Sequence, residues 1–303
     1  MEPLIVENYQ EASRVHALCR KKALDMIQPG VKIIDIADEI ESLILKEKCG
    51  IAFPINLSAN EVAAHDTAGE NDTRIVQEGN TIKIDIGVHK EGYIVDGAFT
   101  VTFSKEEKIK KLLEANQKAL EEGFAQAKEK IEVYKIGMAI EKALKEANVS
   151  PITNLSGHGI DQYVTHCSPT IPNINNRDSS KLENNKGYAI EPFASINGKG
   201  EVNESPQCEI FEVKQNTIIP IRQTNSRKLL GYCIETYKGL PFAERWLAND
   251  FKMNSFARKI ALRDLVQKGA IQAHNILREI KGATVSQFET TILINNGSIL
   301  RMV

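Results

Sequence analysis

Two aspartates on neighbouring β-like segments give the first chemical signal in this chain. Residues 81–88 alternate between apolar and polar side chains, which predicts a half-buried strand that carries Asp85. A second β-rich run, 93–103, carries Asp96 and follows a short connection that ends in glycine, so the two runs predict a hairpin. If residues 89–92 form the loop, Asp85 and Asp96 face each other directly across the two strands.

Directly opposed carboxylates destabilise a sheet unless a proton or a cation lies between them. The apolar neighbours Ile84, Ile86 and Val95 favour burial of the pair, and therefore favour a divalent cation. In the alternative interpretation the polar face is open to water and the register differs by one residue, which places the aspartates on opposite faces. The spacing alone leaves both interpretations open.

Three further residues could complete a metal site. His158 stands between two glycines, and Glu191 and Glu289 each stand in an apolar run. A buried carboxylate is costly unless it is paired or bound to metal, although each of these side chains could instead point to solvent. Taken together, the oxygen-rich donor set suits two hard or borderline cations bridged by carboxylates, an arrangement that hydrolases use.

The remaining pattern mixes helices and strands and predicts an α+β fold. Apolar residues at helical spacing predict a first helix at 7–27, which ends at Pro29-Gly30, and a second that begins at Asp35 and ends at Gly50. We also expect helices at 105–128 and 137–147 and β-rich segments at 151–156, 187–195 and 286–294. The pattern is helical again between 225 and 280, with a helix that opens at Leu240-Pro241. The organisation expected is one catalytic domain over 1–303 with a helical subdomain inserted at about 195–280.

Composition narrows the classes of partner and compartment. The net charge of −2 gives no broad attraction to nucleic acid, so we predict no direct nucleic-acid binding. The N-terminal residues do not resemble a signal peptide, and no apolar run approaches the length of a membrane span. The five cysteines form no C-x-x-C pair and are expected to be reduced thiols. We therefore expect a cytoplasmic protein that does not bind a membrane.

The sequence resembles the methionine aminopeptidase family, whose fold is known as the pita-bread fold. The matching motifs occur in the family's order across nearly the whole chain: Ala52–Pro54, Asn60–His65, Ile82–His89, Asp96, Leu155–His158, His166, Ile190–Phe193, Leu240–Ala243, Arg245–Leu247 and Gln287–Thr291. The long interval between Glu191 and Glu289 is similar to the helical insertion of type 2 members. Because the first expected helix begins almost at residue 1, the chain is similar to archaeal members without a charged extension.

The resemblance implies hydrolytic removal of the N-terminal methionine from nascent proteins and peptides that have a small second residue. It implies two divalent cations per subunit, drawn from Co²⁺, Mn²⁺, Fe²⁺ or Zn²⁺. By matching position, Asp85 would chelate one cation, Asp96 and Glu289 would bridge both, and His158 and Glu191 would complete the second. A bridging water is the implied nucleophile, with Glu191 as its proton acceptor.

The resemblance also assigns substrate contacts. His65 and His166 are implied to be non-ligands that polarise the scissile carbonyl, and Phe53 and Phe193 to line the pocket for the methionine side chain. The expected partners are nascent polypeptide N-termini, with ribosome association as a further expectation, and the expected state is a monomer.

Three departures from the family pattern concern the rim of the substrate pocket. After His65 the family usually has Tyr-Thr-Pro, whereas this chain has Asp66-Thr67-Ala68. After His166 it often has Ala-Gly, whereas here Cys167-Ser168 follows, and the preceding residue is Thr165 instead of an apolar one. These differences bear on the preference for the second residue and on inhibitor sensitivity.

Two other functions compete. A peptidase of the Xaa-Pro type would use a similar ligand set, but such enzymes generally carry a large additional N-terminal domain that we do not expect here. A metal-free relative that binds RNA or ribosomes would be expected to have lost ligands and gained basic segments. All five candidate ligands are present, and the basic run Lys108–Lys111 is short enough to be a solvated helix face.

Overall fold

Two long helices open the chain in the computed structural model, which describes residues 1–214 and 219–303. They are α1 (Pro3–Met26) and α2 (Ile33–Lys46). The buried residues of α1 recur at helical spacing, and Pro3 occupies the first turn, where a missing N–H costs nothing. The predicted start of the second helix at Asp35 is wrong. Helix α2 begins at Ile33, and Asp35 lies in its first turn, where a carboxylate interacts favourably with the helix dipole.

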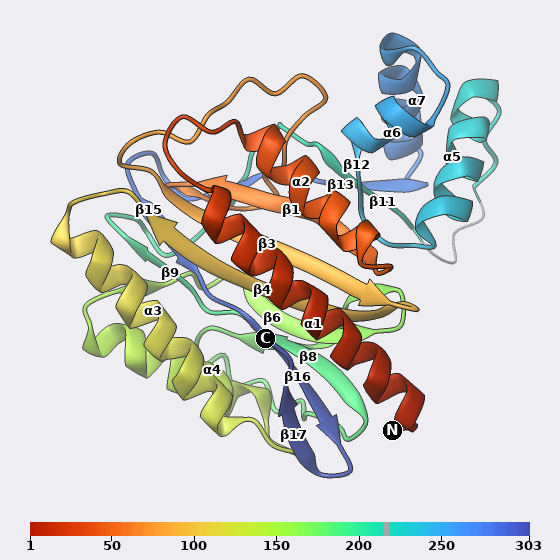
Figure 1. Cartoon of the computed structure of the whole chain (residues 1–303). Coiled ribbons are helices and arrows are strands. Elements are labelled where there is room, and N and C mark those ends of the chain that lie inside the picture. The colour runs from red at the N-terminus through yellow and green to blue at the C-terminus, as the bar shows by residue number, and fades with distance from the viewer. Residues whose placement is uncertain (215–218) are drawn as a thin grey trace.

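These helices pack on a three-stranded antiparallel sheet (Figure 1). Its strands, in the order β1-β3-β4, are β1 (Gly50–Ala59), β3 (Thr81–Lys90) and β4 (Tyr93–Thr102). One continuous apolar cluster joins the buried faces of the helices to the sheet and includes Ile36, Ile40, Ile84 and Val88. This core fixes the strands that carry the two aspartates.

The β3–β4 hairpin has a tighter loop than the sequence predicted. Lys90 pairs with Tyr93, which leaves a two-residue loop of Glu91 and Gly92, both with positive φ, as in a type I′ turn. Asp85 therefore pairs with Ala98, and Asp96 pairs with Gly87. The predicted direct opposition of Asp85 and Asp96 is wrong by two residues. Since a shift of two residues preserves the face of a strand, both carboxylates still lie on the same face, as diagonal neighbours.

A second layer covers the other side of the molecule. Helices α3 (Glu107–Gln126) and α4 (Val133–Glu146) pack on a five-stranded sheet in the order β17-β16-β8-β6-β7 (Figure 1). The strands are β6 (Ser156–Asp161), β7 (Val164–Pro172), β8 (Lys186–Ile190), β16 (Thr290–Asn295) and β17 (Ser298–Arg301). Their shared apolar cluster includes Ile140, Tyr188 and Ile292.

Short strands form the three-stranded sheets β10-β14-β2 and β15-β9-β5. They are β2 (Val62–Ala64), β5 (Ser150–Pro151), β9 (Phe193–Ile196), β10 (Asn203–Glu204), β14 (Leu277–Arg278) and β15 (Thr284–Gln287). The predicted β segment at 151–156 is wrong except at its ends. The predicted segments at 187–195 and 286–294 are each interrupted, the first at Glu191-Pro192 and the second at Phe288-Glu289. Both predicted glutamate ligands therefore lie at breaks between strands.

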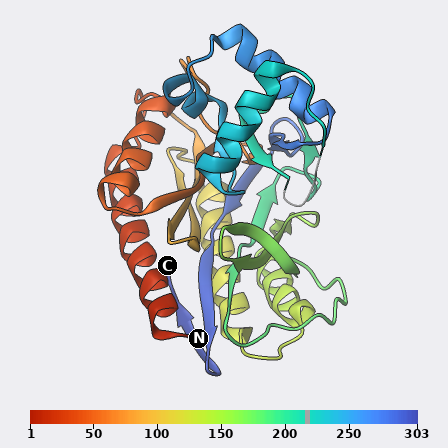
Figure 2. The same cartoon turned by 90° about the vertical axis from the view of Figure 1, so that its right-hand side faces the viewer.

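In residues 195–214 and 219–280, the segment predicted to be a helical insert contains three helices and, beside them, the strands of one three-stranded sheet (Figure 2). They are α5 (Thr224–Tyr237), α6 (Glu244–Asp250), α7 (Ser255–Gln267), β11 (Ile210–Val213), β12 (Phe242–Ala243) and β13 (Ile271–His274). The predicted helix start at Leu240-Pro241 is wrong, because residues 242–243 are extended and α6 begins at Glu244. The helices bury an apolar cluster of their own around Leu229, Phe242 and Leu262. This cluster supports the proposal that about 195–280 form a subdomain within one catalytic domain.

The arrangement confirms the predicted α+β class. Within residues 1–214 and 219–303, every helix is too short or too polar to cross a lipid bilayer.

Two helical glycines make the packing testable. A Cβ at Gly137 in α4 would clash with the backbone carbonyl oxygens of Ile174 and Pro172, whereas a Cβ at Gly231 in α5 would meet open space. Alanine in a helix is favoured over glycine by about 0.5–1 kcal/mol, whereas forced overpacking costs about 1–3 kcal/mol. We expect Gly231→Ala to raise the free energy of unfolding and Gly137→Ala to lower it, as measured by urea denaturation. Equal effects of the two substitutions would contradict the close contact of α4 with the chain at 172–174.

Candidate metal centre and active site

All nine residues that the sequence predicted for the site line one cavity of about 150 Å³. They are Phe53, His65, Asp85, Asp96, His158, His166, Glu191, Phe193 and Glu289. They come from segments spread over most of the chain, so their convergence depends on the tertiary fold. Their individual roles remain predictions.

Backbone pairing between the two main sheets brings the five candidate ligands together. Asp85 and Asp96 lie on β3 and β4, His158 lies on β6, and Glu191 and Glu289 adjoin the paired ends of β8 and β16. The Glu289 N–H donates to the carbonyl of Ala98 at 2.9 Å. The Asp96 N–H donates to the Thr291 hydroxyl at 2.8 Å, and that hydroxyl lies 2.7 Å from the Asp96 carbonyl. These bonds hold β4 against β16 at the point where the carboxylates meet.

The donor atoms lie close enough for a shared ion. One ligand atom from each of Asp96, His158 and Glu289 lies within 4.8 Å of the others. The His158 Nε2 atom is 3.5 Å from Glu191 Oε1 and 3.9 Å from Asp96 Oδ2. Near them, the amide nitrogen of Gln287 lies 3.2 Å from a carboxylate oxygen of Asp85. It lies 3.2 Å from Glu191 and 3.4 Å from Glu289. A single neutral amide is the common hydrogen-bond donor to three carboxylates.

Burial raises the pKa of every carboxyl group in this cluster, and neighbouring negative charge adds to the shift at Asp96, Glu191 and Glu289. Burial is the largest cause for Asp85, whose pKa rises to about 6. The pKa values of Asp96 and Glu191 rise well above their usual range, first through burial and then through the negative charge of Asp85. The pKa of Glu289 rises in the same way, with Asp96 as the strongest negative neighbour. The cluster therefore favours an added positive charge, from protons or from metal.

Unpartnered oxygen atoms indicate that metal cations fit this cluster. In the part of the chain that the structure describes, Oδ1 of Asp85, Oδ1 of Asp96 and Oε1 of Glu289 are buried and accept no hydrogen bond. Buried polar atoms are normally satisfied, so three such oxygens in one cavity point to a cationic partner. The donor set of four carboxylates and one imidazole matches divalent cations of hard or borderline character.

The hydrogen bonding of His158 agrees with a ligand role. Its Nδ1 lies 3.1 Å from the carbonyl oxygen of Gly159, which can only accept, so Nδ1 carries the proton. The Nε2 lone pair then faces the carboxylates. Burial lowers the pKa of His158 to about 4, so the ring is neutral at pH 7. A neutral imidazole with its second nitrogen donating to a carbonyl is the form that binds metal.

Two further histidines, His65 and His166, lie beside the cluster. The His166 ring centroid is 4.4 Å from that of His158, and its Nδ1 lies 3.1 Å from the Thr165 hydroxyl. His65 Nδ1 donates to the carbonyl of Asn275 at 3.1 Å. Burial lowers the pKa of His65 to about 4 and that of His166 well below its usual value. Both rings are therefore neutral at pH 7. In each ring Nδ1 is engaged and Nε2 is free, but the Nδ1 partner is a carbonyl for His65 and a hydroxyl for His166.

Apolar residues close one side of the cavity. Phe53 on β1 pairs with Gly87 on β3, and a Cβ at Gly87 would occupy the space of the Phe53 ring. Glycine at this position therefore lets the ring lie against the sheet. Phe193 is 3% exposed and lines the same cavity, together with Leu155 and Leu277. The cavity thus joins an apolar wall to a carboxylate-rich floor.

Comparison with known proteins identifies the family. The model of metallopeptidase family M24 matches residues 7–215. The chain belongs to family M24. It is 39% identical over 296 residues to a methionine aminopeptidase from Pyrococcus abyssi, which covers 97% of this chain and 98% of that protein. These matches confirm the resemblance predicted from the motifs.

Two solved structures illustrate the similarity of the fold. A thermophilic Arx1 superposes with a TM-score of 0.87 at 18% identity, over 100% of this chain and 91% of the other. A methionine aminopeptidase from Thermotoga maritima superposes with a TM-score of 0.70 at 18% identity, over 100% of this chain and 97% of the other. At such identities the likeness concerns the fold alone, and it confirms the pita-bread architecture of this M24 chain.

Sequence reasoning missed three polar residues of the M24 cavity. Gln287 was part of a matched motif but received no role, although it contacts three carboxylates. Asn56 accepts the His65 backbone N–H at 2.6 Å. His274 lies edge-on to His65, with ring centroids 5.5 Å apart, and its Nε2 lies 2.9 Å from Glu212. The sequence predicted a helix around His274, whereas pairing of β13 with β11 turns this residue into the cavity.

The repulsion among the M24 carboxylates predicts an unusual response to mutation. In chelator-treated protein, Asp96→Asn should be no less stable than wild type, because it removes one of four crowded negative charges. A ligand that binds only the folded state stabilises it by about 2.7 kcal/mol at a hundredfold excess over Kd. Added divalent metal should therefore raise the melting temperature of wild type more than that of Asp96→Asn, as measured by calorimetry. An undiminished metal-induced shift in the variant would show that Asp96 is not a ligand.

Proposed function

We propose that this M24 protein is a methionine aminopeptidase that hydrolyses the bond after the N-terminal methionine, with a preference for a small second residue. The observation that carries the proposal is that five candidate metal ligands, four of them buried, and an apolar wall share one cavity. The 39% identity to the methionine aminopeptidase of Pyrococcus abyssi extends over 97% of this chain and supports the same substrate class for both proteins.

We propose that the cavity holds two divalent cations. Asp85 would chelate one, Asp96 and Glu289 would bridge both, and His158 and Glu191 would complete the second. The oxygen-rich set without thiolate suits Co²⁺, Mn²⁺, Fe²⁺ or Zn²⁺. When bound, such cations lower the pKa of water and polarise a substrate carbonyl, which makes hydrolysis possible at neutral pH.

Glu191 is proposed as the group that moves the proton. It lies at the edge of the carboxylate cluster, with Oε1 near His158 and Oε2 beside the amide of Gln287. A carboxylate at this place can accept a proton from water and deliver it to the leaving amine. The amide of Gln287 keeps the carboxylate oriented while the proton moves.

The hydrogen bonds of the two flanking histidines suggest different tasks for them. His65 uses its Nδ1 proton on the Asn275 carbonyl, so its Nε2 presents a lone pair that can accept from a substrate N–H. In His166, Nδ1 can accept from the Thr165 hydroxyl, so Nε2–H can donate to the scissile carbonyl oxygen. We therefore propose His166 as the donor that stabilises the developing oxyanion and His65 as the residue that orients the amide.

The size and lining of the cavity support removal of a single residue. Its volume of about 150 Å³ is small against the roughly 300–1,000 Å³ of pockets for drug-sized ligands. Phe53 and Phe193 offer apolar surface that suits a flexible thioether. We propose that the methionine side chain lies against these rings while its amide reaches the carboxylates.

We propose nascent polypeptide N-termini in the cytoplasm as the substrates, with a monomer as the working state and transient contact with the ribosome. All five cysteines lie in the described part of the chain and are free. Free thiols are usual in a reducing compartment.

A peptide panel tests the proposed substrate. Purified protein loaded with Co²⁺ or Mn²⁺ should release only methionine, from Met-Gly and Met-Ala peptides far faster than from peptides with a large second residue. Metal analysis should give two ions per chain. Preferential cleavage of Xaa-Pro peptides would transfer the assignment to a proline-specific peptidase.

Substitution of the two histidines tests their proposed tasks. His65→Ala and His166→Ala should keep the metal content of wild type and lose turnover by about 10²–10³-fold, the usual effect of removing one preorganised polar group. Metal content is measured on the same preparations as kcat. Full turnover with either alanine variant would refute the task given to that histidine.

A further inference from the structure

His65 stands in a turn whose backbone is strained. Its φ is +63°, a left-handed conformation that is rare for residues other than glycine. Such a conformation persists only where the surrounding structure fixes it. The direction of the imidazole therefore depends on the direct bonds of His65 to Asn56 and Asn275 and on the contacts of the turn, residues 65–68.

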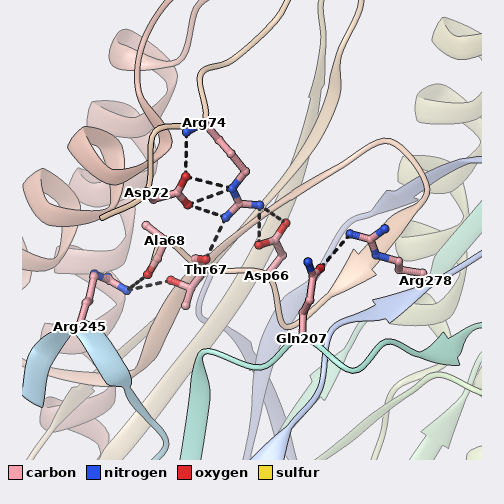
Figure 3. Close-up of polar contacts among 8 residues, drawn as sticks. All are labelled: Asp66, Thr67, Ala68, Asp72, Arg74, Gln207, Arg245 and Arg278. Atoms are coloured by element: carbon pink, nitrogen blue, oxygen red, sulfur yellow. Dashed lines mark hydrogen bonds and ion pairs between the residues drawn. The ribbon is translucent and has the colours of Figure 1, made fainter. Parts of the chain in front are cut away.

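An arginine from the same loop holds the residue that follows His65. The Asp66 side chain is 5% exposed, and both of its oxygens accept hydrogen bonds from Nη1 of Arg74, at 2.9 and 2.8 Å (Figure 3). Nη2 of Arg74 donates to the Thr67 carbonyl at 3.1 Å. One guanidinium thus binds two consecutive residues of the turn.

The guanidinium itself is fixed from two sides. Its Nε donates to both oxygens of Asp72 and its Nη2 to one of them, the latter at 2.7 Å, and Figure 3 shows Arg74 between the two aspartates. The Arg74 carbonyl accepts the N–H of Ile33 at the start of α2. Arg74 is therefore held at its guanidinium and at its backbone carbonyl, although its side chain is 48% exposed, and these contacts orient the Asp66 carboxylate.

Helix α6 supports the far end of the turn. Nη1 of Arg245 donates to the Thr67 hydroxyl at 3.0 Å and to the Ala68 carbonyl at 3.1 Å. Its Nη2 is bound by the buried carboxylate of Glu41. The turn is therefore held by charged side chains at Asp66, Thr67 and Ala68.

We propose that Arg74 is a positioning residue for His65, acting through its ion pair with Asp66. The inference deepens the proposed function and rests on it. Residues 66–68 contain no proline that would restrict the backbone after His65. The Arg74–Asp66 pair supplies the restriction instead. Loss of either residue should therefore have the same effect on the position of His65 as loss of both.

A double-mutant cycle with His65 separates positioning from general stability. Arg74→Ala and Asp66→Asn should each lower kcat on a Met-Ala peptide by about 10–100-fold, since small displacements of a catalytic group cost up to about 10²-fold. KM should change by less than about twofold. In a His65→Ala background the same substitutions should lower kcat by less than about twofold, because no imidazole remains to be positioned.

Two further variants sharpen the test. Arg74→Lys keeps the charge but loses the planar fork, so its kcat should lie between those of wild type and Arg74→Ala. Arg14→Ala is the matched control: the Arg14 side chain has the same 48% exposure and also pairs with two carboxylates, Glu11 and Glu47, but it does not line the cavity, so wild-type kcat is expected. If Arg74→Ala does not fold, as judged by circular dichroism, Asp66→Asn carries the test.

Equal losses of kcat in the wild-type and His65→Ala backgrounds would overturn the inference, as would a change confined to KM. Absence of cleavage of Met-Ala by wild-type protein would instead reject the proposed function. The same cycle, run on the peptide that wild type does cleave, would then still decide whether Arg74 acts through His65.

Discussion

The mutual repulsion of four carboxylates in one buried cavity is the constraint on which the site depends. Burial raises the pKa of Asp85, Asp96, Glu191 and Glu289, and neighbouring negative charge raises the pKa of the last three further. A protein cannot hold such a cluster cheaply unless its backbone is secured elsewhere. Here the two apolar clusters beneath the sheets and the hydrogen bonds that join β4 to β16 stabilise that backbone.

Interruptions in the strands allow side chains to converge on one point that regular strand pairing would keep apart. In a continuous sheet, side chains leave the two faces alternately and few can meet at one point. The breaks at Glu191-Pro192 and Phe288-Glu289 release two carboxylates from this rule, while Asp85 and Asp96 remain on regular strands. Asn116 supports one break by donating to the Pro192 carbonyl at 2.9 Å. The irregular backbone is therefore part of how the ligands are brought together.

The sequence predicted which residues meet better than it predicted how they are held. The alternation of residues 81–88 identified the strand of Asp85, but the hairpin register was missed because Glu91, a residue that seldom has positive φ, begins the turn. The prediction that both aspartates lie on one face of the sheet was still correct, because the register shift was two residues. His274 was hidden in a segment with helical spacing, where pairing with β11 overrides local preference. Asp66 stood out as a departure, but nothing in the spacing pointed to Arg74 as its partner.

The hydrogen bond from His65 to the carbonyl of Asn275 reaches from one half of the molecule into the segment proposed as an insert. That segment therefore contributes to the protonation state of a residue encoded far earlier in the chain. Strands β11 and β13 cannot be replaced without an effect on His65 unless the replacement also places a hydrogen-bond acceptor where the Asn275 carbonyl lies. Without this segment, the His65 imidazole could adopt either tautomer.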